Sequence, residues 1–259
     1  MRLEEETLDL GPVRSRVWSK GTGRPLAFLA GFGGTPRWPE FLDPLASEHR
    51  VLVPALPGFP GATGHHELDD IVDWVAATLD ILEAAGFEQG VLVGASVGGM
   101  IAAEIAALCR PMVERLVLCA PLGLFDEHDP VADVFAVPPA EIPAFLSAAP
   151  EKLAGFFARP EGEDELEWTV LTARAAEAAA RLLWPLGDRG LWKRLHRISA
   201  PTLLVWGAED RVVPRSYAQR FAREIRGPVK IETVPGAGHL SYLDRPAEVA
   251  SRLRAFLRA

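Results

Sequence analysis

Hydrophobic positions recur along this chain in short runs that alternate with segments of helical periodicity. Residues 4–19 alternate between polar and apolar side chains around Gly11-Pro12, as an antiparallel hairpin would. Six later short runs are rich in apolar residues, and we interpret them as strands that are apolar on both faces and covered by helices on both sides. They are residues 26–29, 51–53, 91–93, 116–119, 203–206 and 229–234. This alternation of strand and helix signals predicts an α/β protein with a doubly wound, mostly parallel sheet.

Two helices are clearly indicated by the same pattern. One ends before Gly86 and covers residues 68–85, with its apolar side chains on one face: Leu68, Ile71, Val72, Val75, Leu79 and Leu82. The other covers residues 246–257 and begins with Pro246, since proline is favoured in the first turn of a helix.

The alternating pattern is interrupted once, between residues 122 and 197. No parallel strand is predicted there. The stretch contains helical segments, many aromatic residues and five prolines between Pro130 and Pro150. A stretch of this length does not fit as a loop inside a compact domain. We therefore predict an α/β core of residues 1–121 and 198–259, with residues 122–197 inserted into it as a helical cap.

Composition and charge narrow the class of protein. Hydrophobic residues make up 49% of the 259 residues, enough for the large core of a globular protein. A formal net charge of −8 argues against a nucleic-acid partner, because phosphate binding needs a basic face. The acidic N-terminus lacks the apolar run of a signal peptide. Two cysteines, Cys109 and Cys119, make no disulfide framework, and Cys119 lies in an apolar run typical of a buried thiol. These features predict a cytoplasmic protein.

One stretch, residues 91–109, is long enough to cross a bilayer and has Glu104 as its single charge. Its first half contains Gly94-Ala95-Ser96-Val97-Gly98-Gly99, which suits a sharp turn better than a uniform span. No aromatic belt flanks it and no second span follows. We interpret the stretch as a buried strand followed by a buried helix, and we expect no membrane partner.

The strongest chemical signal is Gly94-Ala95-Ser96-Val97-Gly98, which matches the G-x-S-x-G pattern of a nucleophile elbow. A predicted strand precedes it and a predicted helix follows, as that turn requires. Small residues are needed at the flanking positions because the turn holds the serine in a strained backbone conformation. Ser96 is therefore the candidate nucleophile. The alternative is a glycine-rich turn that only packs a helix on a strand.

A serine hydroxyl needs a base to take its proton, and histidine is the expected base. Of the six histidines, only His239 lies in a glycine-rich loop directly after a predicted strand. The others lie in polar segments typical of solvated side chains: His49, His65, His66, His128 and His196. Adjacent histidines without other spaced ligands are weak evidence for a metal, so we predict no metal site at His65-His66.

The base in turn needs a carboxylate that orients its ring. Asp210 follows the predicted strand at residues 203–206 and is the candidate, while Glu209 and the more distant Asp126 are its competitors. The chain order Ser96, Asp210, His239 is the order of the nucleophile, acid and base in the α/β-hydrolase fold.

Together these motifs resemble the α/β-hydrolase fold family over the whole predicted core. Four further segments carry the likeness. Leu29-Ala30-Gly31-Phe32-Gly33-Gly34 resembles the family's oxyanion loop, and Ala55-Leu56-Pro57-Gly58-Phe59 resembles its loop after the next parallel strand. Residues 206–214 resemble the acid segment, and residues 236–239 resemble the histidine loop. The resemblance implies that the backbone N–H groups of Phe32 and Val97 form an oxyanion hole.

Two positions depart from that family pattern. Many members have histidine where this chain has Ala30 and an acid where it has Ala55. Because the oxyanion donors are backbone groups, the first departure changes the support of the loop rather than the donors. The second affects only local hydrogen bonding in a turn.

These residues predict a serine hydrolase that cleaves a small ester-like substrate through an acyl-enzyme, with no metal or organic cofactor. Open alternatives are a carbon–carbon hydrolase, a lactonase, a perhydrolase, or a small-molecule receptor that retains the triad. Ser96 argues against dehalogenases and epoxide hydrolases, which use aspartate. Leu240 stands where carbon–carbon hydrolases commonly have tryptophan.

Candidate substrate contacts are Trp184, Phe156, Phe157 and Leu240. A small molecule is the expected partner, and assembly as a homodimer is left open.

The predicted cap is acidic. Residues 122–188 contain 13 Asp and Glu against 4 Lys and Arg, a net charge of −9. Four of the acids lie in Glu161-Gly162-Glu163-Asp164-Glu165, which is typical of a solvated loop. The cap charge favours neutral substrates over anionic ones, unless Arg174 or Arg181 points inward and binds a substrate carboxylate.

Overall fold

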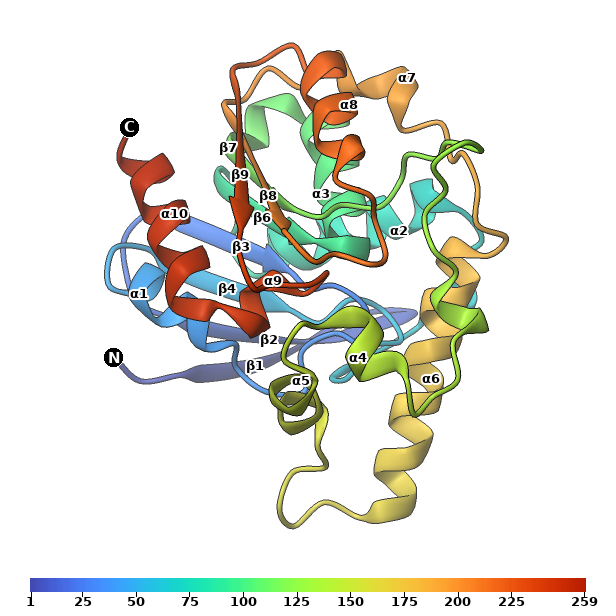
Figure 1. Cartoon of the computed structure of the whole chain (residues 1–259). Helices are drawn as coiled ribbons and strands as arrows, with labels where there is room; N and C mark the ends of the chain where they lie inside the picture. The colour runs from blue at the N-terminus through green and yellow to red at the C-terminus, as the bar shows by residue number, and fades with distance from the viewer.

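The protein is described by a computed structural model that covers residues 1–259 (Figure 1). It begins with the predicted hairpin, in which β1 (Glu4–Leu10) pairs antiparallel with β2 (Val13–Lys20). All six apolar runs form strands, namely β3 (Pro25–Leu29), β4 (Arg50–Pro54), β6 (Gly90–Ala95), β7 (Val113–Cys119), β8 (Thr202–Gly207) and β9 (Val229–Val234). A two-residue strand that was not predicted, β5 (Ala62–Thr63), pairs with β2.

These strands form one mixed sheet in the order β1-β2-β4-β3-β6-β7-β8-β9. From β4 to β9 every neighbouring pair in this order is parallel. The predicted α/β-hydrolase fold with a mostly parallel sheet is therefore confirmed. Because parallel strands end at the same edge, the loops after β6, β8 and β9 all open on one side of the molecule.

Helices cover both faces of this sheet (Figure 1). On one face lie α1 (Asp43–Ala46) and α10 (Pro246–Arg258), which contact one another. On the other lie α2 (Ile71–Ala84), α3 (Ser96–Leu108), α7 (Trp192–Leu195) and α8 (Ser216–Glu224). The remaining short helices of the core are η1 (Glu40–Leu42), η2 (His65–Glu67), η3 (Arg110–Met112) and α9 (Ser241–Asp244).

Helix α2 starts three residues later than the apolar pattern predicts. The Asp70 side chain accepts hydrogen bonds from the backbone N–H groups of Val72 and Asp73, and the Asp73 side chain accepts from Asp70 in return. This capping box starts the helix at Ile71. Val72, which was assigned to the buried face, is 62% exposed, while Trp74 and Ile81 are buried instead.

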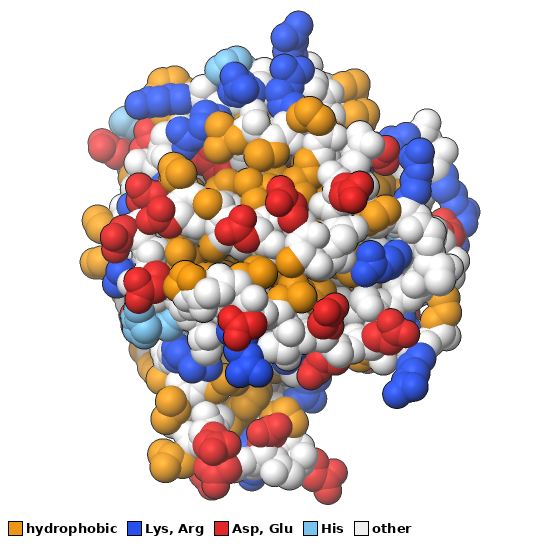
Figure 2. All heavy atoms as spheres, turned by 180° about the vertical axis from the view of Figure 1, so that it is seen from behind, with side chains coloured by type: hydrophobic (Ala, Val, Ile, Leu, Met, Phe, Trp, Pro, Cys, Tyr) orange, Lys and Arg blue, Asp and Glu red, His pale blue; other side chains and the backbone are white.

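Between β7 and β8 the chain forms no strand. It contains η4 (Val134–Ala136), α4 (Ile142–Leu146), α5 (Pro150–Phe157), α6 (Glu165–Leu183) and then α7. Helix α6 and the loop before it project from one end of the molecule (Figure 1). Acidic side chains gather at that projecting end (Figure 2), where Glu161, Glu163 and Asp164 are exposed.

The last helix of this segment, α7, packs against the core rather than on α6. Its Arg194 donates two hydrogen bonds of 2.6 Å, from Nε and Nη2, to the two carboxylate oxygens of Glu104 in α3. Glu104 is buried, and the paired guanidinium balances its charge. The same pair explains how the single acid of the apolar run 91–109 is tolerated in the core.

That apolar run divides at Ala95 and Ser96 into strand β6 and helix α3, as predicted. No helix in the structure combines the length and hydropathy needed to span a membrane. Cys119 at the end of β7 is buried, and burial raises the pKa of its thiol to about 12, so it remains an uncharged core side chain.

Candidate active site

Ser96 stands at the turn between β6 and α3 with a φ of 52°, which is rare for a residue other than glycine. The flanking glycines allow this turn. A side chain at Gly98 would lie 2.3 Å from the carbonyl oxygen of Leu29, and one at Gly94 would lie 2.4 Å from that of Gly98. Any other residue would force these backbones apart, so the sequence pattern has a direct steric cause.

His239 lies in the loop after β9 and reaches back to this turn. Its Nε2 is 2.7 Å from the Ser96 Oγ, and its Nδ1 is 3.1 Å from the Asp210 Oδ2. The side chains of His239 and Asp210 are 1% and 0% exposed. The three residues come from the ends of β6, β8 and β9, and the structure brings them together as a buried chain of hydrogen bonds.

The second oxygen of Asp210 holds the carboxylate in place. Its Oδ1 accepts hydrogen bonds from the backbone N–H groups of Val212, at 2.8 Å, and Val213, at 3.0 Å. The carboxylate therefore presents one oxygen to its own loop and the other to His239. A histidine held in this way by a carboxylate can accept a hydroxyl proton with its other nitrogen.

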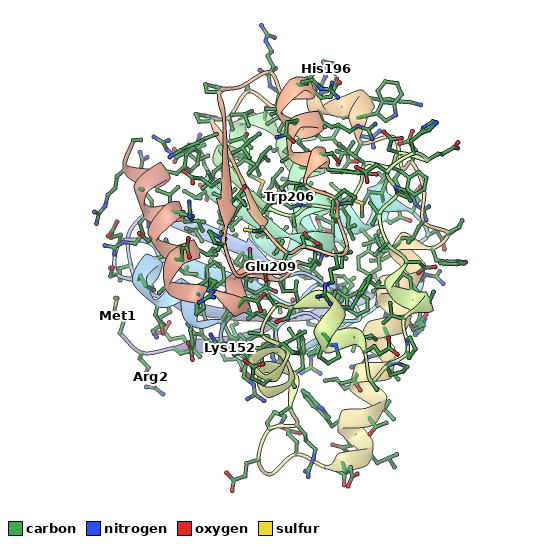
Figure 3. The ribbon with its side chains drawn as sticks, viewed as in Figure 1. Met1, Arg2, Lys152, His196, Trp206 and Glu209 are labelled. Carbon is green, nitrogen blue, oxygen red and sulfur yellow. The ribbon has the colours of Figure 1, made fainter.

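The two competing acids take other partners. Glu209, near the carboxyl end of β8 (Figure 3), accepts a hydrogen bond from the backbone N–H of Gly236 at 3.1 Å. Asp126 lies beside His128 and is 3.2 Å from Arg220, and a hydrogen bond from the His128 backbone lowers its pKa. Neither acid contacts His239.

Two backbone N–H groups beside Ser96 have no acceptor within the protein. Phe32 lies in the loop after β3, and its amide donates no hydrogen bond. Val97 is the second residue of α3, a position at which the amide has no partner within its helix. A developing oxyanion is stabilised by such free donors together with the positive end of the helix dipole.

A small cavity of about 10 Å³ adjoins Ser96 and His239. The nine other residues that line it are all hydrophobic: Phe32, Leu122, Val131, Ala132, Val134, Leu146, Leu183, Leu186 and Val212. Seven of these, from Leu122 to Leu186, come from the segment between β7 and β8. The pocket is therefore apolar and uncharged apart from the reacting groups, and it is nearly closed, far below the volume of about 300–1,000 Å³ that is usual for a ligand site.

None of the four predicted substrate contacts lines this cavity. Helix α6 ends at Leu183, which faces the cavity, whereas Trp184 turns outward and is 55% exposed. Phe156 lines a separate pocket of about 370 Å³ beside Arg37 and Lys152. Phe157 packs against Gly33 in the loop after β3.

Leu240 is fully buried under the same loop, close to Gly31. The aromatic pair thus supports the walls of the site from outside, while aliphatic neighbours form the pocket. Which of two adjacent side chains faces inward depends on the rotation of the helix, and that is set by packing.

The sequence gives little indication of Asp244, which is buried in α9 and holds the histidine loop. Its Oδ2 accepts hydrogen bonds from the backbone N–H groups of Gly238, at 2.7 Å, and Ala148, at 3.0 Å, and its Oδ1 accepts from the Ser147 hydroxyl. Gly238 directly precedes His239. The one available signal was an acid in an otherwise apolar stretch, five residues after the histidine.

The fold and this arrangement define a class: an α/β protein with a serine–histidine–aspartate chain at the carboxyl edge of its sheet. Residues 26–252 match the family model described as the alpha/beta hydrolase family, and the chain belongs to that family. Its relatives are diverse, so membership establishes a hydrolase fold without a substrate.

One relative is the dihydrolipoyllysine-residue acetyltransferase component of an acetoin cleaving system from Pseudomonas putida, 29% identical over 91% of this chain. This chain spans 64% of that relative's length. Another is the 2-hydroxy-6-oxo-6-(2'-aminophenyl)hexa-2,4-dienoic acid hydrolase of Metapseudomonas resinovorans, 25% identical over 98% of this chain and 90% of the relative. Among solved structures, a membrane phospholipase A described as a bacterial virulence factor shares the fold, with a TM-score of 0.82 and 22% identity over 99% of this chain and 86% of the other.

Proposed function

We propose that this protein is a serine hydrolase that cleaves small, uncharged carboxylic esters through an acyl-enzyme on Ser96. The observation that carries the proposal is the Ser96–His239–Asp210 chain of hydrogen bonds beside an uncharged apolar cavity. A hydroxyl that already donates toward an oriented imidazole is prepared for proton transfer.

In the proposed reaction, the Ser96 Oγ attacks the ester carbonyl while its proton passes to the His239 Nε2. The carbonyl oxygen becomes an oxyanion held by the amides of Phe32 and Val97. His239 then gives the proton to the leaving alkoxide, so that an alcohol departs and the acyl group stays on Ser96. Water, deprotonated by the same histidine, releases the carboxylic acid. Asp210 stabilises the imidazolium that forms in each step.

The segment between β7 and β8 would act as the cap that selects the substrate. It supplies seven of the nine hydrophobic lining residues, and it closes over Ser96 so tightly that the cavity of about 10 Å³ has room for no more than about one water molecule. We therefore expect α4 and α6 to move outward when an ester binds, and short acyl chains to be preferred because they need the smallest movement.

A second candidate is cleavage of a carbon–carbon bond, favoured by the similarity to the Metapseudomonas hydrolase. The name of that enzyme gives its substrate as a dienoic acid. An acid of this kind is ionised near neutral pH, and burying it without a cation is costly. The cavity here has no Lys or Arg in its lining. The absence of a cation from the lining therefore favours an uncharged ester over a dienoic acid as the substrate.

The test of the proposal is turnover of aryl acetates and butyrates, together with labelling by a fluorophosphonate probe. We expect burst kinetics, one label per chain located on Ser96 by mass spectrometry, and loss of both in Ser96→Ala. Turnover in that variant should fall by at least ~10⁴-fold, because only binding and the oxyanion donors remain.

Other outcomes assign other functions. Activity within tenfold of the parent in Ser96→Ala would remove Ser96 from the mechanism. A kcat/KM greater for a dienoic acid than for aryl esters would favour the carbon–carbon hydrolase, and one greater for a lactone would favour the lactonase. Peroxide-dependent oxidation that exceeds ester hydrolysis would favour the perhydrolase. Stabilisation by a small ligand with no turnover of any ester would favour a receptor that retains the triad.

A further inference from the structure

Two adjacent histidines in η2 and a glutamate in α6 meet where that helix packs against the core. The Nε2 of His65 is 2.5 Å from the Oε2 of Glu177, and the Nδ1 of His66 is 3.8 Å from the Oε1 of Glu177. One ligand atom from each residue lies within 4.8 Å of the other two. We propose that His65, His66 and Glu177 form a binding site for a divalent transition-metal ion such as Zn²⁺, which joins α6 to the core.

The donor set suits such an ion. Two imidazole nitrogens and one carboxylate are a common ligand set for Zn²⁺, which binds nitrogen at about 2.0–2.1 Å. Two ligand atoms of a tetrahedral ion at that distance are about 3.3 Å apart. This separation lies between the 2.5 Å from His65 to Glu177 and the 3.8 Å from His66 to Glu177. Small movements of Glu177 and His66 would therefore bring all three atoms to the ion. Magnesium and calcium prefer oxygen ligands and are not expected to bind.

Burial makes one ligand fixed and the other two adjustable. His65 is 1% exposed, and its ring is held in the core, whereas the side chains of His66 and Glu177 are 67% and 48% exposed. The ion would thus be open to solvent on one side, where water completes its coordination. On binding, the Nε2 of His65 gives its lone pair to the metal, and its ring hydrogen resides on Nδ1.

That Nδ1 is buried without a hydrogen-bond partner. Metal-binding histidines usually donate this hydrogen to an acceptor, and loss of the acceptor weakens metal binding by about 10–100-fold. We therefore expect micromolar affinity rather than the tight binding of a structural zinc site.

The position of the site gives it a consequence for the fold. Glu177 lies in the middle of α6, and its neighbour one turn further, Arg181, donates to the backbone oxygens of His66 and Leu68 and to the Asp69 carboxylate. The same helix ends at Leu183 in the cavity beside Ser96. A metal at Glu177 would hold α6 more firmly against the core loop and so restrict movement of the proposed cap.

The experiment is calorimetric titration of chelator-treated protein with ZnCl₂ near neutral pH, with MgCl₂ as the second probe. We expect saturable binding of one Zn²⁺ per chain and none of Mg²⁺. His66→Ala and Glu177→Gln should each weaken Zn²⁺ binding by roughly tenfold or more, since each removes a ligand. Zn²⁺ should also raise the unfolding temperature of the parent, and the increase should be much smaller for His66→Ala.

The matched control is His128→Ala, which removes an exposed histidine that also lies beside a carboxylate, 3.5 Å from Asp126, but has no third ligand. This variant should bind Zn²⁺ as the parent does. No saturable heat with Zn²⁺, or full affinity retained in His66→Ala, would overturn the proposal and leave a hydrogen bond between His65 and Glu177. The readout is binding and stability, so it does not depend on the proposed hydrolase activity.

Discussion

At the scale of single residues, the candidate site depends on how each oxygen of Asp210 is used. Oδ1 accepts from the amides of Val212 and Val213, and Oδ2 faces the Nδ1 of His239. Since Oδ1 is already occupied by two donors, the carboxylate has one orientation. The histidine is thereby held with hydrogen on Nδ1 and a free lone pair on Nε2, which faces Ser96.

Asp210→Asn should leave the fold intact and lower turnover by ~10³–10⁴-fold. The asparagine oxygen would stay with the two amides, so its NH₂ group would face His239 and favour the tautomer with hydrogen on Nε2. Rates of aryl-ester hydrolysis, with circular dichroism to check the fold, provide the measurement.

The matched control for that variant is Asp126→Asn, because Asp126 also follows a core strand but pairs with Arg220 and His128. Its turnover should stay within a few-fold of the parent. If Asp126→Asn were crippling and Asp210→Asn nearly harmless, Asp126 would be the acid of the site.

At the scale of elements, the loop after β9 is held from both ends. Glu209 accepts from the amide of Gly236, and Asp244 in α9 accepts from that of Gly238. Asp244 also accepts from Ser147 and Ala148, just before α5. The carboxylate therefore links the histidine loop to the turn between α4 and α5 in the proposed cap.

Asp244→Ala should lower the free energy of unfolding by about 2–5 kcal/mol, because it leaves the buried amide of Gly238 and the buried hydroxyl of Ser147 without their acceptor. It should also lower kcat by roughly 10–100-fold through displacement of His239. Urea unfolding and steady-state kinetics measure the two effects.

Asp244→Asn is the control for this variant. Its side-chain oxygen can accept from the amides while its NH₂ donates to Ser147, so it should keep most of the parent's activity. An Asp244→Ala protein with the parent's kcat would show that the loop needs no such support.

At the scale of the whole molecule, charge is distributed unevenly. Residues 122–188 carry a net charge of −9, and acidic side chains gather at the projecting end (Figure 2). The cavity itself has no charged lining residue apart from the reacting histidine. Arg181, considered from the sequence as an inward-pointing cation, is paired with Asp69 instead. Both the surface field and the pocket therefore disfavour an anionic substrate.

Neutral short-chain esters should accordingly exceed esters with a free carboxylate in kcat/KM at low salt. Part of the gap should close as salt rises, because exposed charges are screened over ~10 Å at 0.1 M. The part due to burial should remain, since screening does not reach the cavity. A preference for the carboxylate ester that is lost in Arg174→Ala would show that a cation enters the pocket after all.

Much of this protein was determined by short stretches of sequence. All six predicted parallel-sheet strands, the opening hairpin and the turn at Ser96 were predicted, because hydrophobic periodicity and steric limits on turns act over a few neighbouring residues. The convergence of Ser96, Asp210 and His239 followed as well, since each comes at the end of a strand and parallel strands end at one edge. The start of α2 was misplaced because a capping box overrode the apolar pattern.

Only the tertiary structure decided which side chains meet across long separations in the chain. It placed Leu183 rather than Trp184 at the cavity, brought Asp244 to Gly238 and Ser147, and set Glu177 beside His65. Residues 65 and 177 are 112 positions apart, and 147 and 244 are 97 apart. Such contacts depend on the angle and rotation at which α6 and the neighbouring helices pack on the core, and those follow from the fit of many side chains at once.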